Sequence, residues 1–415
     1  MAWAMRLAGW IVLLLALGVL AARAGEAARW VQYDADGAAE ARLATDAPQC
    51  PSLTIDGQAV AMTERAPPDR DFALRLCALV LPAGAKTIAA PGGRLPVPAT
   101  TPGTIVVIGD TGCRVLGPSI QDCNDPKAWP FAAVARRAAG LQPDLVIHVG
   151  DYLYRETPCP PGLSRCAGTP WGDNWPTWDA DFFRPAGPLL AAAPFVFVRG
   201  NHETCARAGA GWLRLLGPER KDQMSPCVAH LPPYAVNAGM LDLVVVDAAE
   251  AADTGANPAL TSIYAADAAA VARLARGRSW LVMHRPLRGV VRLATGAVVG
   301  GNDTMLPTLG ANLPASVELL LSGHIHAFEI IDYDGEAPPQ LIAGNGGDLL
   351  DAAPEDLAGI VVGGVKIARG MALPGFGFLE MSRNATGWRI VAYDVSGKRL
   401  RQCQLAERRI ACQKT

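Results

Sequence analysis

Short apolar runs recur along most of the chain and alternate with alanine-rich stretches of helical character. The runs predict strands over Ile105–Ile108, Leu145–Val149, Phe195–Val198, Leu241–Val246, Trp280–Met283, Val317–Leu321, Gln340–Ala343, Phe376–Met381 and Trp388–Tyr393. The intervening stretches predict helices over Trp129–Leu141, Thr177–Leu190, Ala206–Leu216 and Ile263–Arg276. Strands that are apolar on both faces and alternate with helices indicate an α/β core whose sheets are covered by other layers.

The first hundred residues have a different pattern. Residues 25–101 carry short β-prone runs between Pro/Gly turns, which predicts a small β-sandwich domain, and the segment Pro96–Gly103 is typical of a linker. We expect a catalytic α/β domain over 102–398. A short C-terminal extension, 399–415, contains Cys403 and Cys412, and we expect a disulfide to close it.

The extreme N-terminus predicts a cleaved signal peptide over residues 1–24. Arg6 precedes the apolar run Leu7–Leu20, and Ala22 and Ala24 place small residues before the expected cleavage site. The run is shorter than the roughly 20 residues that a membrane span needs, although an uncleaved anchor is the alternative. We therefore expect a secreted or periplasmic protein that has no membrane span once the signal is removed.

Composition narrows the classes of protein further. Of 415 residues 50% are hydrophobic, which excludes a disordered chain. Lys and Arg number 37 against 39 Asp and Glu, a net charge of −2, so the chain has no basic surplus for a nucleic acid backbone. We expect no nucleic acid as a specific partner, and oligomeric state is left open.

All ten cysteines follow the predicted signal peptide, which agrees with an oxidising compartment. Loop closure costs least between near neighbours along the chain. It favours the pairs Cys50–Cys77, Cys113–Cys123, Cys159–Cys166, Cys205–Cys227 and Cys403–Cys412. No Cys-x-x-Cys occurs, which argues against a zinc ribbon or a thioredoxin-type site.

Polar residues cluster directly after five of the predicted strands. The loops are Gly109-Asp110-Thr111-Gly112, Gly150-Asp151-Tyr152-Leu153-Tyr154, Gly200-Asn201-His202-Glu203, His284-Arg285-Pro286 and Gly323-His324-Ile325-His326. Each loop alone is typical of a turn or a helix cap. Four of the six histidines lie in them, and the carboxyl ends of strands are where α/β sheets bind ligands.

Together these loops offer two carboxylates, an amide oxygen, three imidazoles and a phenol. This mixed O/N set suits iron, manganese or zinc rather than calcium. One carboxylate can bridge two cations, and two metal ions about 3.5–4 Å apart form a clamp for in-line attack at phosphorus.

The ordered blocks resemble those of the calcineurin-like metallophosphoesterases and, more narrowly, the purple acid phosphatases. Asp-x-Gly, Gly-Asp-x-x-Tyr, Gly-Asn-His-Asp/Glu, Val-x-x-His and Gly-His-x-His correspond here to 110–112, 150–154, 200–203, 281–284 and 323–326. Gly112 stands where the wider superfamily has a histidine, which favours the purple acid phosphatase branch, and Leu281 replaces Val. The resemblance implies a four-layer αββα sandwich core preceded by a small all-β N-terminal domain.

The resemblance also implies a ligand set. One metal would be held by Asp110, Asp151, Tyr154 and His326, and a second by Asp151, Asn201, His284 and His324, with Asp151 bridging. In that family the first ion is Fe(III), and the second is divalent Zn, Fe or Mn. A metal-bound hydroxide would attack phosphorus while both cations offset phosphoryl charge.

Substrate contacts are carried over from the same family. His202 would be a catalytic residue that contacts substrate and donates a proton to the leaving group, and Glu203 would orient its imidazole. Asn201, Arg285 and Asn345 complete the predicted substrate-binding set. Plant members have further histidines after the fourth block, whereas residues 285–323 contain none, so the arginines there are the candidates for binding phosphate.

These observations predict a phosphatase that acts on small phosphate monoesters. The alternatives are a phosphodiesterase on nucleotides or phospholipid head groups that uses the same metals, and a non-catalytic surface binding protein. The second alternative predicts missing ligands, and none is missing. Asn302 and Asn384 begin glycosylation sequons, which matter only in a cell that glycosylates them.

Overall fold

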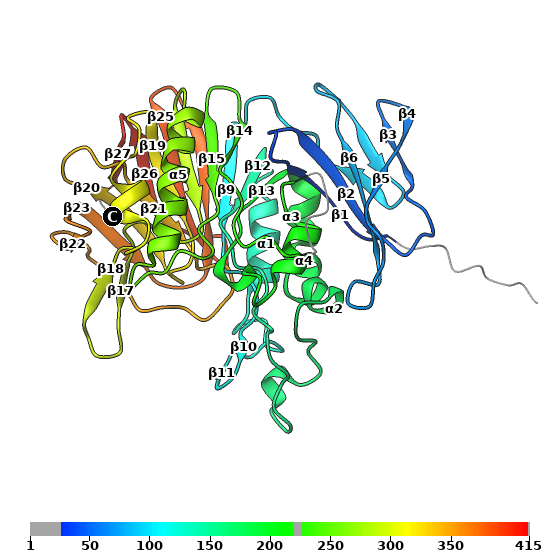
Figure 1. The fold of residues 1–415 in the computed structure, drawn as a ribbon, viewed down its shortest axis with the longest axis horizontal. Coiled ribbons are helices and arrows are strands. Elements are labelled where there is room, and N and C mark those ends of the chain that lie inside the picture. The colour runs from blue at the N-terminus through cyan, green and yellow to red at the C-terminus, as the bar shows by residue number, and fades with distance from the viewer. Residues whose placement is uncertain (1–25, 220–225, 414–415) are drawn as a thin grey trace, which may run out of the picture.

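The computed structural model describes residues 26–219 and 226–413 (Figure 1). The predicted signal peptide lies outside the described residues. Among those residues, no helix combines the length and apolarity that a membrane crossing requires.

Two large sheets form the core. The first has the order β27 (Arg409–Cys412), β26 (Arg399–Ala406), β25 (Gly387–Asp394), β24 (Gly377–Asn384), β9 (Thr104–Ile108), β12 (Leu145–His148), β13 (Phe195–Phe197), β1 (Glu26–Tyr33), β2 (Ala39–Thr45), β6 (Arg75–Val80) and β5 (Thr63–Ala66). The second has the order β14 (Tyr234–Asn237), β15 (Asp242–Val246), β16 (Ser279–Met283), β19 (Val317–Ser322), β21 (Gln340–Ala343), β20 (Phe328–Tyr333), β23 (Val365–Leu373) and β22 (Val361–Val362). The strands that precede the five polar loops are parallel to one another within each sheet: β9, β12 and β13 in the first, and β16 and β19 in the second.

Alternation of side chains along the strands builds the layers. In β9, Ile105 and Val107 pack between the two sheets, while Val106 and Ile108 pack on the opposite face. Helices α1 (Phe131–Ala139), α3 (Arg184–Ala192) and α4 (Gly209–Leu215) cover the outer face of the first sheet, and α5 (Pro258–Leu274) covers that of the second (Figure 1). The predicted αββα sandwich is therefore confirmed.

One predicted helix, Thr177–Leu190, is divided in the structure. It consists of α2 (Trp175–Trp178), a π-helical turn over Asp179–Phe183 and α3. Asn174 caps the first turn by accepting a hydrogen bond from the Thr177 N–H, which moves the start of the helix to Trp175.

The N-terminal region is all-β, as predicted. A four-stranded sheet, β4 (Gln58–Ala61), β3 (Ser52–Ile55), β7 (Ile88–Ala90) and β8 (Gly93–Leu95), packs through an apolar core against β1, β2 and β6. Those three strands also continue the first core sheet, because β1 pairs with β13. The segment expected to be an extension, 399–415, contributes β26 and β27 to the same sheet.

The five disulfides pair as loop closure favours. They are Cys50–Cys77, Cys113–Cys123, Cys159–Cys166, Cys205–Cys227 and Cys403–Cys412. Three of them close loops that follow the first three polar blocks along the chain.

Two buried arginines attach the N-terminal strands to α4. Arg42 on β2 donates hydrogen bonds to the carbonyls of Leu215 and Gly217, each 2.8 Å long, and forms an ion pair with Glu40. Arg65 on β5 donates to the carbonyls of Leu213 and Arg214. These carbonyls belong to the last turn of α4 and the chain beyond it, where a helix leaves acceptors unpaired.

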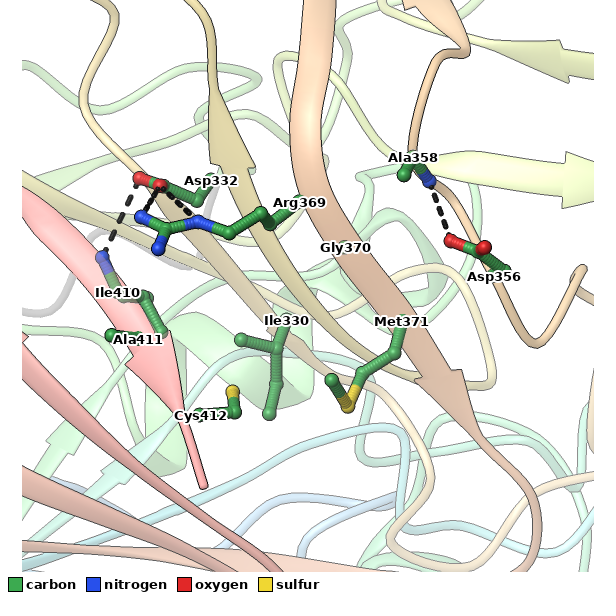
Figure 2. Close-up of a pocket in the computed structure, with 10 residues that line it drawn as sticks. All are labelled: Ile330, Asp332, Asp356, Ala358, Arg369, Gly370, Met371, Ile410, Ala411 and Cys412. Carbon is green, nitrogen blue, oxygen red and sulfur yellow. Dashed lines mark hydrogen bonds and ion pairs between the residues drawn. The ribbon is translucent and has the colours of Figure 1, made fainter. Parts of the chain in front are cut away.

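A cavity of about 300 Å³ lies where the edges of the two sheets approach each other (Figure 2). Residues of β20, β23 and β27 line it, together with the loop at Asp356. Its buried acid, Asp332, is paired with Arg369 and Arg409. None of its lining residues belongs to the predicted site.

We expect Arg42→Met to lower the free energy of unfolding by about 3 kcal/mol, because it leaves Glu40 buried without its cation and two carbonyls without donors. Thermal or denaturant unfolding measures the change. Arg273→Met, an exposed arginine on α5, is the matched control and should change stability by less than about 0.5 kcal/mol. Equal effects of the two substitutions would show that the Arg42 contacts are not stabilising.

Candidate metal centre

The two core sheets each bring part of the predicted ligand set. Asp110, Asp151 and Asn201 follow β9, β12 and β13, which are neighbours in the first sheet. The three histidines, His284, His324 and His326, follow β16 and β19, which are neighbours in the second. The site therefore forms between the sheets, at the carboxyl ends of their central parallel strands.

The Tyr154 phenol lies where the two sets meet. Its hydroxyl is 2.8 Å from Asp151 Oδ2, 3.2 Å from Asp110 Oδ1 and 2.9 Å from His326 Nε2. The same Asp151 oxygen, Oδ2, also lies 3.2 Å from His284 Nε2. The same nitrogen is 3.0 Å from the amide oxygen of Asn201.

Two groups of ligand atoms result, with Asp151 in both. Asp110, Asp151 and His326 form one group, and Asp151, His284 and His324 form the other, each with its ligand atoms within 4.8 Å of one another. The donors are carboxylate and phenol oxygens and imidazole nitrogens, a set that fits iron, manganese or zinc. The structure thus brings all seven predicted ligands together in an arrangement that fits two cations.

The backbone at three of these residues is in the left-handed region. Asp110, Asp151 and His324 have φ values of 55°, 59° and 70°. A residue with a Cβ atom pays for this conformation, at roughly 1 kcal/mol or more each. Such strain persists where the surrounding structure over-determines it, which is typical of binding and catalytic sites.

Two glycines of the motifs let the loops approach the carboxylates. A Cβ atom on Gly200 would lie 2.0 Å from Asp151 Oδ1, and one on Gly323 would lie 2.4 Å from Asp110 Oδ2. Both positions therefore need glycine for space, although neither has a positive φ. Alanine at either position would displace a predicted metal ligand.

The electrostatics of the site favour positive charge. Burial disfavours the cationic form of His284, but the Asp151 carboxylate outweighs burial and raises the pKa of His284 to about 9. Burial acts likewise on His326, yet Asp110 and Asp348 raise its pKa to about 10. The pKa of Tyr154 is raised well above its usual value by burial and by Asp151 and Asp110. Buried anions that stabilise imidazolium this strongly would also stabilise a metal cation.

Each imidazole is oriented by a hydrogen bond at its second nitrogen. His284 Nδ1 lies 2.8 Å from the Val149 carbonyl, and His326 Nδ1 lies 2.7 Å from the Leu349 carbonyl. In both rings Nε2 is left to face the carboxylates. His324 differs, because its Nε2 lies 2.8 Å from Asp253 Oδ2 and Nδ1 is left for a metal ion.

The acceptors that orient the three histidines are the Val149 carbonyl, the Leu349 carbonyl and Asp253, so Asp253 is the one side chain among them. The sequence motifs did not identify it. Its other oxygen accepts a 3.0 Å hydrogen bond from Asn302 Nδ2. Asn302 is fully buried, and its amide oxygen accepts hydrogen bonds from the N–H groups of Thr304 and Met305. The Asn302 sequon thus holds a structural side chain with no room for a glycan.

Arg285 joins the same cluster. It forms an ion pair with Asp253, and its Nη1 lies 3.0 Å from His324 Nε2. Because Arg285 lies beside a predicted metal ligand, it stays a predicted phosphate contact. Asn345 is different: it is buried, and its side-chain amide donates to the Gly375 carbonyl. The Gly-Asn-Gly-Gly turn supports the Asp110 loop through backbone hydrogen bonds, including Gly346 N–H to the Gly109 carbonyl.

His202 lies beside the Asp151 carboxylate, and its ring centre is 3.8 Å from that of the Tyr154 ring, with the two planes tilted by 39°. Its Nδ1 is 2.6 Å from Glu156 Oε1, and Arg207 forms an ion pair with the same glutamate. Burial lowers the pKa of His202. Glu156 and Arg207 were not found from the sequence, although Glu156 follows Tyr154 by only two positions.

The prediction that Glu203 orients the His202 imidazole is wrong. The Glu203 carboxylate instead accepts hydrogen bonds from the N–H groups of Gly200, Asp151, Tyr152 and Leu153. Burial, together with the charge of Asp151, raises its pKa to about 8. Glu203 therefore fixes the loop that carries the bridging ligand, and Glu156 takes the place beside His202.

The sequence motifs also did not identify Asp348, a buried acid. It forms an ion pair with Arg114 and has an oxygen 3.3 Å from His326 Nδ1. The Arg114 guanidinium lies 4.8 Å from the centre of the Tyr154 ring. Asp348 directly follows the Gly-Asn-Gly-Gly turn, which was the available sequence signal.

A family model for the calcineurin-like phosphoesterases matches residues 103–328 of the chain. No curated protein sequence matches the chain. Among solved structures, it is similar to the purple acid phosphatase PPD1 from seeds of yellow lupin (Lupinus luteus), with 14% identity, a TM-score of 0.56, and coverage of 91% of this chain and 73% of that one. It is also similar to PhoD, with 10% identity, a TM-score of 0.52, and coverage of 94% and 92%. At these identities the two structures show a shared fold.

We expect Asp253→Asn to weaken binding of the metal ion that His324 would ligate by about 10- to 100-fold, because the imidazole loses its anionic partner. Metal content after dialysis against a weak chelator, measured by atomic emission, should fall from two ions per chain towards one. Asp303→Asn, an exposed neighbour that contacts no predicted ligand, is the control. Retention of both ions at wild-type chelator resistance would show that Asp253 does not support the site.

Proposed function

Because the chain belongs to the calcineurin-like phosphoesterase family, we propose that it is a secreted or periplasmic phosphatase that hydrolyses small phosphate monoesters with two metal ions. The observation that carries the proposal is the pair of ligand groups that share Asp151. The five disulfides support an oxidising compartment.

Two cations at these ligands would supply Lewis acidity, which activates water and offsets charge on the phosphoryl group. We propose Fe(III) beside Tyr154 and divalent Zn, Fe or Mn beside His284 and His324. A phenolate is a hard anionic donor, so it favours the trivalent ion.

The chain's own residues supply the remaining functions. His202 is assigned the role of giving a proton to the leaving group. Its Nδ1 lies beside Glu156, and its Nε2 lies 3.8 Å from Asp151 Oδ2 and 3.1 Å from Arg207 Nη2. Asn201 and Arg285, which lie beside His284 and His324, are the proposed contacts for phosphate oxygens. Glu203 keeps Asp151 in place through the backbone of its loop. Asn345 remains a proposed substrate contact through its turn.

We expect the metal-loaded protein to hydrolyse 4-nitrophenyl phosphate faster than bis(4-nitrophenyl) phosphate. His202→Ala should lower kcat by about 10²- to 10⁴-fold while both metal ions are retained. His230→Ala, which removes a histidine paired with Asp267 outside the site, is the matched control. Faster cleavage of the diester would favour the phosphodiesterase alternative. Full metal content without either activity would contradict the proposal, and loss of metal in His202→Ala would make His202 a ligand.

The ferric assignment has its own test. If Tyr154 binds Fe(III), the purified protein should show a visible charge-transfer absorption band, and Tyr154→Phe should abolish it. Tyr234→Phe, at a buried tyrosine that donates to the Phe197 carbonyl, should leave the band unchanged. A colourless active protein that holds only zinc or manganese would refute Fe(III) and leave phosphatase activity standing.

A further inference from the structure

We propose that the substrate of this metal centre is a phosphate ester whose organic group is apolar, and that an apolar rim binds this group. The rim consists of Leu293, Val298 and Val299 on the hairpin β17 (Val290–Arg292)–β18 (Val298–Gly300), together with Leu349 and Leu350. The inference rests on the proposed phosphatase function and specifies its substrate class.

The rim is exposed although its side chains are large and apolar. The exposed fractions are 44% for Leu293, 40% for Val298, 44% for Val299, and 39% each for Leu349 and Leu350. These five residues make up almost half of the eleven large apolar side chains that are exposed in the described part of the chain. An exposed apolar patch of this kind marks a binding surface more often than isolated apolar residues do.

The hairpin is built on the loop that carries two predicted metal ligands. Val291 packs against a small apolar cluster that contains Ile325, the residue between His324 and His326. The Arg292 N–H donates a 2.8 Å hydrogen bond to the Ala352 carbonyl, which joins the hairpin to the segment that carries Leu349 and Leu350. The hairpin thus has a fixed position relative to the metal centre.

Leu349 and Leu350 adjoin the centre itself. The Leu349 carbonyl accepts the 2.7 Å hydrogen bond from His326 Nδ1, and Asp351 accepts one from the His326 N–H. Leu349 is thus in direct contact, through its backbone, with a predicted metal ligand, and its exposed side chain is available to an organic group bound beside the centre. This contiguity with the metal centre is why the rim is assigned to substrate rather than to a partner protein.

Charge supports an apolar occupant. Residues 293–302, which include the hairpin tip and β18, contain no charged side chain. A hairpin that met a sugar or a nucleotide would offer several polar and charged groups for its hydroxyls and bases. This one has a single charged side chain, the exposed Arg292 at the end of β17, and otherwise presents mainly small and aliphatic side chains. Figure 1 shows the β17–β18 hairpin projecting from the core on the same side as the β10–β11 hairpin (Val115–Leu116 and Ser119–Ile120), which follows the Asp110 loop.

A series of monomeric n-alkyl phosphates from ethyl to octyl tests the inference. We expect kcat/KM of the metal-loaded protein to rise about two-fold per added CH₂, half the effect of full burial, which gives about 60-fold over the series. In the triple variant Leu293→Ser/Val298→Ser/Val299→Ser, the slope of log(kcat/KM) against chain length should fall by at least half. Val60→Ser, at an exposed strand position in the N-terminal sheet, should keep the wild-type slope.

Binding of n-alkylphosphonates, measured by calorimetry, gives a readout that does not need turnover. Tighter binding with chain length, lost in the triple variant, supports the rim even if no phosphate is hydrolysed, in which case the proposed function alone fails. An active enzyme with a flat chain-length series, or an unchanged slope in the triple variant, would overturn the inference. So would a wild-type dimer in sedimentation that the triple variant converts to a monomer, because a second copy would then cover the rim.

Discussion

Two carboxylates, Asp110 and Asp151, are buried within hydrogen-bonding distance of one phenol, and the rest of the site is arranged around their negative charge. Anions removed from water are costly unless cations lie close to them. The first sheet brings the anions and the second brings three imidazoles, so these groups meet where the two sheets come together. The candidate metal centre is thereby also a connection between the two halves of the sandwich.

The surroundings of the ligands show how the fold protects this arrangement. Glu203 receives four backbone N–H groups around the Asp151 loop, while backbone carbonyls and Asp253 orient the histidines. Among the groups that orient the histidines, the acceptors for His284 and His326 are main-chain carbonyls, which substitution does not remove. Asp253 is the exception, and its own position depends on Asn302, 49 residues farther along the chain.

The sequence predicted the fold class, the strands before each motif and the disulfide pairs, and it identified the seven candidate ligands that the structure brings together, because each leaves a local signal. Apolar runs, Gly-Asp or His-x-His ends and near-neighbour cysteines can be seen within a few residues. Asp253 and Arg207 could not be found this way, since their significance arises from contacts with side chains on other loops. Glu203 was given the wrong partner for the same reason: its position in a motif does not reveal which way its carboxylate points. The sequence also could not predict that the N-terminal strands and the core share one sheet, because this depends on pairing between β1 and a strand more than 160 residues away.

The order of strands in the first sheet has a consequence for how the protein is made. β9, which carries the Asp110 loop, lies between β12 and β24, and β24 comes from residues 377–384 near the end of the chain. β1, the first described strand, likewise can pair with β13 only after β13 has been made. Pairings between such distant segments slow folding, because the loops that separate them must close first. During synthesis from the N-terminus, β9 can therefore pair with β24 only after residues 377–384 have been made. The candidate metal centre, which includes the Asp110 loop after β9, is thus among the last parts of the molecule to be assembled.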